Sequence, residues 1–126
     1  MSILAAALSK IERYDRNAER ECLIGPLSNL IIKILDILKQ NNYIKDYEII
    51  TKERGGAAKV LLLGKINSCG TTPRFSLSLK DFEKYEKRFL PAFNVGILII
   101  STSQGLFSHR EAKEKHLGGR IIAYCY

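Results

Sequence analysis

The chain has 126 residues, 46% of them hydrophobic, and its formal net charge is +7. That length allows one domain or two small lobes with a real hydrophobic core, which argues against wholesale disorder. A basic protein of this size most often binds nucleic acid or an anionic membrane surface. The longest apolar run, over residues 30–38, is interrupted by two charged residues, so no membrane-spanning segment is predicted.

The first half of the chain alternates helical and extended patterns. Apolar residues recur at three-four spacing near the N-terminus and again after Pro26, which is typical of helices with one buried face. Two runs rich in Ile, Val, Leu and Tyr follow, and the glycines at 55 and 56 between them favour a hairpin. The predicted elements are a helix over 3–16, a strand over 21–24, a helix from 27 that stops at 41–42, and a hairpin of strands 43–51 and 58–66.

The second half is predicted to be richer in strands. Ser108 and Glu111 form a capping box, and Gly118 is placed to end the helix that they open. The predicted elements are a linker over 67–73, a strand alternating from Phe75 to Lys80, one or two helical turns over 81–88, a loop at 90–93, a strand over 95–100, a helix from 108 to about 117 and a strand over 120–126. This order predicts an α+β protein of two small α/β lobes, a helical N-terminal lobe over 1–68 and a sheet-rich C-terminal lobe over 69–126.

Three hydroxyl side chains, those of Ser101, Thr102 and Ser103, follow the most apolar strand of the chain. Small groups that both donate and accept hydrogen bonds can enter a shallow polar groove, and the basic helix behind them favours an anionic partner. If the strand continues through this segment, alternation places Ser101 and Ser103 on one face and Thr102 on the other. The alternative is a Ser/Thr turn that satisfies its own backbone.

Basic residues also gather in the middle of the chain, where Arg54, Lys59, Lys65, Arg74 and Lys80 occur without an acidic residue between them. Lys59, Lys65 and Arg74 are the candidates for phosphate contacts, and the alternative is a solvated face with chance clustering. The aromatic residues are scattered and predict no basic and aromatic stripe of the kind that stacks unpaired bases. A structured RNA duplex, recognised by its shape and by its 2′-hydroxyls, is then the better ligand.

Catalysis would need residues that the sequence does not arrange. Cys69 with His109 or His116 could form a nucleophile and base, but no orienting acid stands at a defined spacing from them. The three cysteines show no CxxC spacing, so neither a metal site nor a disulfide framework is predicted, and a reducing compartment is the simplest setting. We expect no enzymatic activity, no cofactor, no metal and no small-molecule substrate.

The ordered motifs of the chain resemble those of one family. They are Leu23-Ile24-x-Pro26-x-Ser28, Gly64-x-Ile66-Asn67-x-Cys69-Gly70, Pro73-Arg74-Phe75, Leu90-Pro91, Ser101-Thr102-Ser103-x-Gly105-Leu106, Arg110-Glu111-Ala112-Lys113 and Gly118-Gly119-Arg120-Ile121. Because these motifs occur in this order across nearly the whole chain, the chain resembles small-subunit ribosomal protein eight in its eukaryotic and archaeal form. In eukaryotes this protein is also called protein fifteen-A.

The resemblance implies a structural protein that binds the central domain of small-subunit ribosomal RNA early in assembly, beside neighbouring ribosomal proteins. Ser101, Thr102, Ser103 and Gly105 would enter the RNA minor groove, and the Gly118-Gly119 turn would support them. Gly119 and Arg120 are also expected among the RNA-binding residues. The resemblance also implies cytoplasmic ribosomes, with a nucleolar stage during assembly if the source is eukaryotic. An RNA-binding regulator outside the ribosome has the same chemistry and is the alternative.

Overall fold

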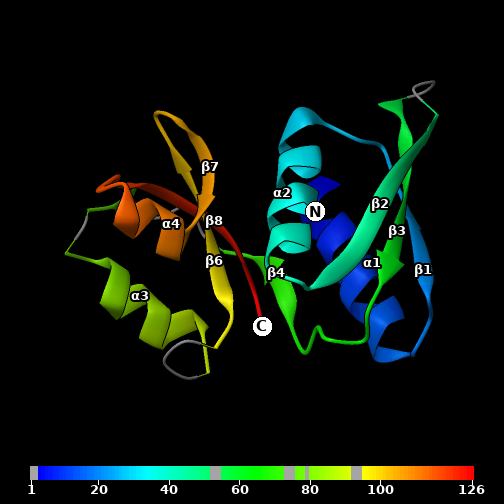
Figure 1. The fold of residues 1–126 in the computed structure, drawn as a ribbon, viewed down its shortest axis with the longest axis horizontal. Coiled ribbons are helices and arrows are strands. Elements are labelled where there is room, and N and C mark those ends of the chain that lie inside the picture. The colour runs from blue at the N-terminus through cyan, green and yellow to red at the C-terminus, as the bar shows by residue number, and fades with distance from the viewer. Residues whose placement is uncertain (1–2, 52–54, 73–75, 79, 92–94) are drawn as a thin grey trace. The chain divides into compact units, whose positions relative to one another are not determined.

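The computed structural model describes residues 3–51, 55–72, 76–78, 80–91 and 95–126. Within these residues the fold has four helices and two antiparallel sheets, which confirms the predicted α+β class. Contacts within the chain divide it into two compact units, Met1–Cys69 and Gly70–Tyr126 (Figure 1). No helix among the described residues is long and apolar enough to cross a membrane.

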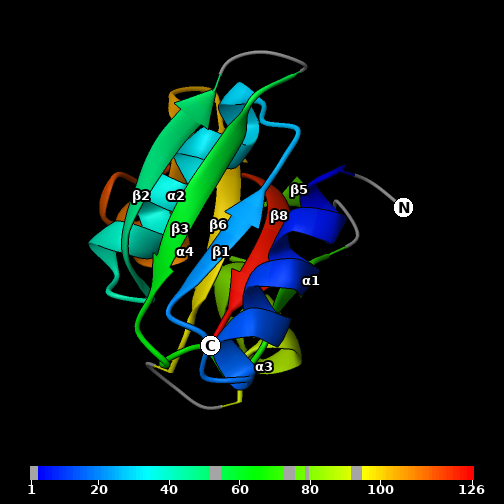
Figure 2. The ribbon, with the colours of Figure 1, turned by 90° about the vertical axis from the view of Figure 1, so that its right-hand side faces the viewer.

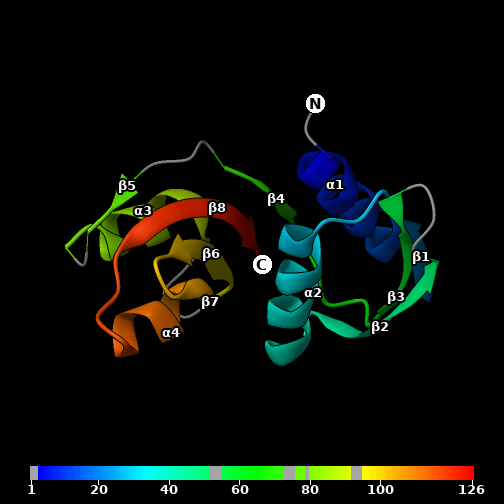
Figure 3. The same ribbon diagram turned by 90° about the horizontal axis from the view of Figure 1, so that it is seen from above.

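The first unit packs two helices against one face of a three-stranded sheet (Figure 3). Its elements are α1 (Ile3–Arg16), β1 (Glu21–Ile24), α2 (Asn29–Gln40), β2 (Ile44–Thr51) and β3 (Ala57–Leu62), with the strand order β1-β3-β2. Figure 2 looks toward the face of this sheet that lies away from α2. The predicted apolar stripes of both helices form the core, and its fully buried side chains include Leu8, Ile11, Ile34, Leu35, Leu38 and Ile44.

Two boundaries of this unit differ from the prediction for local reasons. Leu27 precedes α2, because Ser28 is the N-cap and its Oγ accepts a hydrogen bond from the N–H of Ile31 at 3.3 Å. Strand β3 ends at Leu62 rather than at residue 66. The buried carboxylate of Asp15 accepts hydrogen bonds from the N–H groups of Gly64 and Ile66, both at 2.9 Å, and so holds this segment as a turn. The rest of the hairpin prediction is confirmed by the antiparallel pairing of β2 with β3, although Arg54 lies outside the described residues.

A non-glycine residue at positive φ follows the C-terminal end of each of the helices α1, α2 and α4. These residues are Ala18 (φ 61°), Asn42 (φ 62°) and His116 (φ 55°). At the end of α1, the N–H of Glu19 donates to the carbonyl of Tyr14 at 3.0 Å and that of Ala18 to Asp15 at 3.2 Å, which is the Schellman pattern. Alanine is a costly residue for this conformation, because its Cβ crowds the neighbouring carbonyl.

Ala18→Gly is therefore expected to raise the free energy of unfolding by about 0.5–1 kcal/mol, since the left-handed strain that is removed exceeds the extra backbone entropy of glycine. Ala6→Gly, at an exposed position in the interior of α1, is the matched control and should lower it by about 1 kcal/mol. Urea unfolding of the two variants beside the wild type measures both effects. Equal destabilisation by both substitutions would contradict the role of Ala18.

The second unit is built around its last strand. Its elements are β4 (Cys69–Thr71), β5 (Ser76–Leu77), α3 (Phe82–Phe89), β6 (Ile97–Thr102), β7 (Gly105–Ser108), α4 (His109–Glu114) and β8 (Gly119–Cys125). The sheet order is β4-β8-β6-β7, and β5 also pairs with β8. The core is a cluster of buried apolar side chains from the helices and the sheet, namely Phe82, Leu90, Leu98, Ile100, Ala112 and Ile121.

Several predicted elements of this unit are corrected. The segment predicted as a linker contains strand β4, and Thr72 after it donates a hydrogen bond to the carbonyl of Ile122 at 3.0 Å. The strand predicted from Phe75 to Lys80 is described only as the two residues of β5, with Phe75 itself outside the described residues. Strand β6 begins at Ile97 rather than at residue 95, because Gly96 has a φ of +86°.

Helix α4 has the predicted N-cap, Ser108, but ends earlier than predicted. The Oγ of Ser108 accepts a hydrogen bond from the N–H of Glu111 at 3.4 Å. The prediction that Gly118 ends the helix is wrong. The residue in the left-handed conformation is His116, and the N–H of Leu117 bonds back to the carbonyl of Ala112 at 2.9 Å.

Candidate nucleic-acid interface

The three hydroxyl residues lie at the end of a β-hairpin formed by β6 and β7. Strand β7 was not predicted from the sequence, and its pairing sets Thr102 opposite Gly105. Ser103 and Gln104 form the exposed tip. Two-residue hairpin loops usually take turns with positive φ inside the loop, whereas here the positive φ, +124°, belongs to Gly105 just after it. No atom lies within 4 Å of a Cβ built on Gly105, so glycine is needed there for its backbone conformation.

Thr102 builds the turn. Its Oγ1 donates a hydrogen bond to the carbonyl of Gly105 at 2.8 Å and accepts one from the N–H of Gln104 at 3.2 Å. The Ser/Thr turn that the sequence left as the alternative therefore describes this residue. Among the described residues the hydroxyls of Ser101 and Ser103 have no such intramolecular partner.

The predicted alternation of the three hydroxyls applies only in part. Ser101 and Thr102 are the last residues of β6 and point to opposite faces of the sheet, but Ser103 belongs to the turn. Its direction is therefore set by the turn rather than by the period of the strand.

Ser101 is the centre of a cross-strand row. It lies directly opposite Leu106 of β7 and Arg120 of β8, and Arg120 in turn lies opposite Ser76 of β5. Residues that face each other across an antiparallel pair project from the same face, about 5 Å apart at Cβ. This row thus places the exposed guanidinium-bearing side chain of Arg120 beside the hydroxyl of Ser101.

Gly119 allows β8 to come this close to the hairpin. A Cβ on Gly119 would lie 2.1 Å from the carbonyl oxygen of Ser101 and 2.9 Å from its carbonyl carbon. No side chain can occupy that space without moving one of the two strands. Gly119 is the first residue of β8, and the lack of a side chain there lets this strand lie against Ser101. That it supports the hydroxyl segment in RNA binding stays a prediction.

Lys115 was not among the predicted site residues and lies next to the hairpin. Its Nζ is 4.6 Å from the ring centroid of Phe107 in β7, and its side chain is exposed. In sequence it is one of several cations near the end of a helix. Its contact with Phe107 of β7 depends on the tertiary fold, so no local sequence pattern predicts it.

The predicted phosphate contacts in the middle of the chain are not all available. Lys59 lies in β3 directly opposite Glu48, and its Nζ is 3.6 Å from a carboxylate oxygen of Glu21, so its charge is partly offset. Lys65 is exposed and lies in the segment after β3. Both belong to the first unit, whereas the hairpin belongs to the second, and Arg74 lies outside the described residues.

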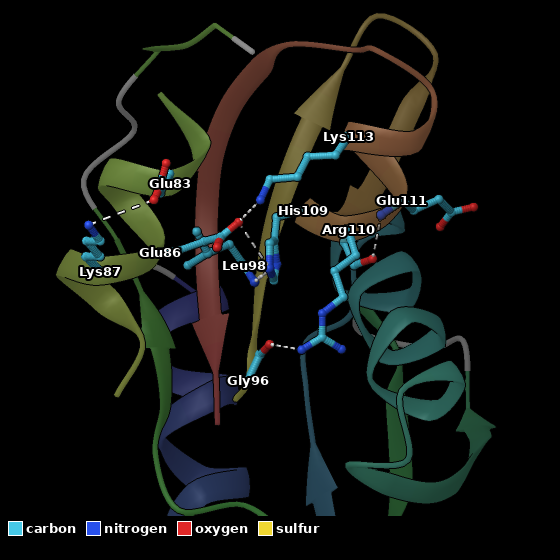
Figure 4. Close-up of polar contacts among 10 residues, drawn as sticks. Glu83, Glu86, Lys87, Gly96, Leu98, His109, Arg110, Glu111 and Lys113 are labelled. Carbon is cyan, nitrogen blue, oxygen red and sulfur yellow. Dashed lines mark hydrogen bonds and ion pairs between the residues drawn. The ribbon is translucent and has the colours of Figure 1, made fainter. Parts of the chain in front are cut away.

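Two of the three residues of the enzyme alternative, Cys69 and His109, are buried. Cys69 lies in β4 and is only 3% exposed, which corrects its predicted place in a polar loop. His109 is also buried, and its Nδ1 accepts a hydrogen bond from the N–H of Leu98 at 3.0 Å (Figure 4). Burial lowers the pKa of His109 to about 4, against a smaller opposing effect of Glu86. His116 is exposed at the end of α4, and no group of three possible metal ligands occurs within the described residues.

Glu86 of α3 lies under α4 and is largely buried. Its carboxylate pairs with the ammonium of Lys113 and lies 3.6 Å from Nε2 of His109, and only 12% of its side chain is exposed. Figure 4 shows both partners converging on it from α4. The sequence held a signal, because Glu86 stands four residues after Phe82 and three before Phe89, on the apolar face of α3.

Four aromatic residues of the second unit, which are scattered in the sequence, come together in the fold. Tyr85 and Phe89 of α3 stack with Tyr124 and Tyr126 of β8, with centroid distances of 6.3, 6.3 and 6.0 Å along the series. We call these four residues the aromatic ladder. Their faces cover one another, so the ladder is not an open platform for unpaired bases.

One comparison with known proteins identifies the family. The chain matches the family model of ribosomal protein S8 over residues 2–126, which is essentially its whole length. That family consists of structural ribosomal proteins rather than enzymes. The chain therefore belongs to the ribosomal protein S8 family, and it is a ribosomal protein of the small subunit that binds ribosomal RNA and takes part in translation.

Proposed function

We propose that this protein binds the central domain of small-subunit ribosomal RNA through the β6–β7 hairpin and thereby supports assembly of the subunit. The observation that carries the proposal is the row in which Ser101 and Arg120 lie side by side, next to the exposed tip residue Ser103. The hairpin belongs to the proposed C-terminal lobe over 69–126. Neighbouring small-subunit proteins are the further partners, and in a eukaryote assembly would begin in the nucleolus.

The chemistry of the hairpin suits the minor groove of an RNA duplex. That groove is wide and shallow and displays 2′-hydroxyls, which both donate and accept hydrogen bonds. The hydroxyls of Ser101 and Ser103 can match either role. Arg120 supplies a cation for a flanking phosphate, and Lys65 and Arg74 are proposed as phosphate contacts, with a smaller contribution from Lys59 because of Glu21.

The division of labour within the hairpin follows from its hydrogen bonds. Thr102 and Gly105 hold the turn in one shape, so the two serines reach the RNA with little conformational freedom left to lose. Gly119 lets β8 lie close against the hairpin at Ser101. The proposed contact is thus a rigid one, made by small groups on a sheet.

Ser103→Ala is expected to weaken RNA binding by about 1–2 kcal/mol, because one RNA group loses its hydrogen-bond partner. The dependence of affinity on salt should not change, since no charge is removed. Ser9→Ala, which removes an exposed hydroxyl from α1, is the matched control and should bind as the wild type does. Equal affinity of the wild type and a Ser101→Ala, Ser103→Ala double variant, with both folded, would refute the minor-groove contact.

The choice of RNA domain is tested with transcripts of the separate domains of small-subunit ribosomal RNA. We expect the central-domain transcript to bind most tightly and to compete with the intact RNA. The role in assembly is tested by cosedimentation with small subunits through a high-salt wash. Tighter binding to another domain, or loss of the protein in the wash, would contradict the respective part of the proposal.

A further inference from the structure

The outer side of α3 carries cations that are positioned by the aromatic ladder. Nζ of Lys84 lies 5.6 Å from the ring centroid of Tyr85, and the guanidinium carbon of Arg88 lies 5.4 Å from that of Phe89. The two cations are four residues apart on one helix, so they lie on the same side of it, and both are exposed. Rings beneath a long cationic side chain reduce the conformational entropy that it loses on binding.

The acidic residues of α3 and its cap are each engaged elsewhere. Asp81 accepts hydrogen bonds from the N–H and the hydroxyl of Ser78 at 3.1 and 3.0 Å, although Lys84 is near enough to help lower its pKa. Glu83 pairs with Lys87 at 3.9 Å, and Glu86 turns inward to α4. The cations on this side of the helix therefore dominate its field.

The aromatic ladder also ties this helix to the strand that supports the hairpin. Phe89 of α3 stacks on Tyr124 of β8 at an interplanar angle of 15°, and β8 carries Gly119 and Arg120 at its other end. A surface on α3 and the hairpin are thus held by the same strand. One structured RNA could bind both without a change in the protein.

We propose that Lys84 and Arg88 form a second RNA contact of this protein, which binds backbone phosphates of a duplex while the hairpin occupies the minor groove. The inference rests on the proposed function, because the same ribosomal RNA is the ligand. The contact is independent of base sequence and contributes through counterion release. Lys87 stands beside it on the helix but shares its charge with Glu83, which makes it the natural control.

The test measures the affinity of the full chain for a small-subunit ribosomal RNA transcript over a range of KCl concentrations. The variants are Lys84→Gln with Arg88→Gln, the control Lys87→Gln, and the hairpin double variant Ser101→Ala with Ser103→Ala. We expect the α3 double variant to flatten the plot of log affinity against log salt by up to about 1.8, since each lost duplex phosphate contact removes about 0.9. The control should keep a slope close to that of the wild type.

The outcomes separate the two proposals. A wild-type slope for the α3 double variant, with the hairpin variant still weakened, would overturn the second contact and leave the proposed function intact. Wild-type affinity of the hairpin variant would instead contradict the proposed function. A wild-type slope together with poor incorporation of the α3 variant into reconstituted subunits would assign this surface to an acidic protein neighbour, which also overturns the RNA contact. Unchanged urea unfolding curves show that the variants are folded.

Discussion

Gly119→Ala is expected to destabilise the second unit by about 3 kcal/mol or more, at the upper end of what overpacking costs, and to abolish RNA binding. The new methyl group would lie 2.1 Å from the carbonyl oxygen of Ser101. Relief requires β8 to move away from β6, which breaks the pairing of Ser101 with Arg120 and of Ile100 with Ile121. The cross-strand row that carries the proposed site would be lost together with the backbone hydrogen bonds between β6 and β8.

Gly105→Ala separates this steric effect from backbone strain. Space around Gly105 is open, so alanine there costs only the strain of its φ of +124°, about 1–3 kcal/mol. Urea unfolding and RNA affinity of the two variants should therefore rank Gly119→Ala as the more damaging in both. A Gly119→Ala protein with the unfolding midpoint and RNA affinity of the wild type would show that β8 does not hold the hairpin as described.

The second unit is also expected to lose stability in mild acid because of His109. Its Nδ1 accepts the hydrogen bond from Leu98, and its pKa in the folded chain is about 4 against an ordinary value of 6.5, chiefly because of burial. Glu86 opposes this shift, while Arg110 and Lys113 add to it. Below pH 6.5 the unfolded chain binds a proton that the folded chain does not, so the stabilising contribution is complete above pH 6.5 and is lost as the pH falls toward 4.

The free energy of unfolding should consequently fall by about 1.4 kcal/mol per pH unit, or about 3 kcal/mol over the interval, from this group alone. His109→Asn retains an acceptor for the N–H of Leu98 but does not titrate. We expect the difference in unfolding free energy between wild type and variant to shrink steadily from pH 6.5 to pH 4 in urea titrations. A difference that is constant over this range would exclude the neutral, buried imidazole.

The sequence predicted the elements whose signals are local. The helix over 3–16 and the strand over 21–24 have the predicted bounds, because periodic apolar residues determine the buried face of the helix and Gly25-Pro26 ends the strand. Strands β4 and β7 were missed because they are only three and four residues long, and their partners in the sheet stabilise them. Cys69–Thr71 pairs with a strand some fifty residues later, and Gly105–Ser108 contains the serine that was interpreted only as a helix cap.

The candidate site was predictable in its composition but not in its geometry. The motif pointed to Ser101, Ser103 and Gly119, yet only the register of β6 with β8 sets Arg120 beside Ser101. The use of the Thr102 hydroxyl within the turn depends on where β6 ends. The aromatic ladder joins α3 to β8 across more than thirty residues of sequence, and no local sequence pattern predicts a contact of that kind.

The central claim is that the β6–β7 hairpin lies on small-subunit ribosomal RNA. It is tested most directly by Ser103→Cys carrying an iron chelate that generates hydroxyl radicals, because the native cysteines Cys22, Cys69 and Cys125 are all buried. The chelate at the exposed tip should cleave the bound RNA at one cluster of nucleotides within the central domain. An intact RNA, or weak cleavage spread over all domains, with the labelled protein still bound, would contradict the account.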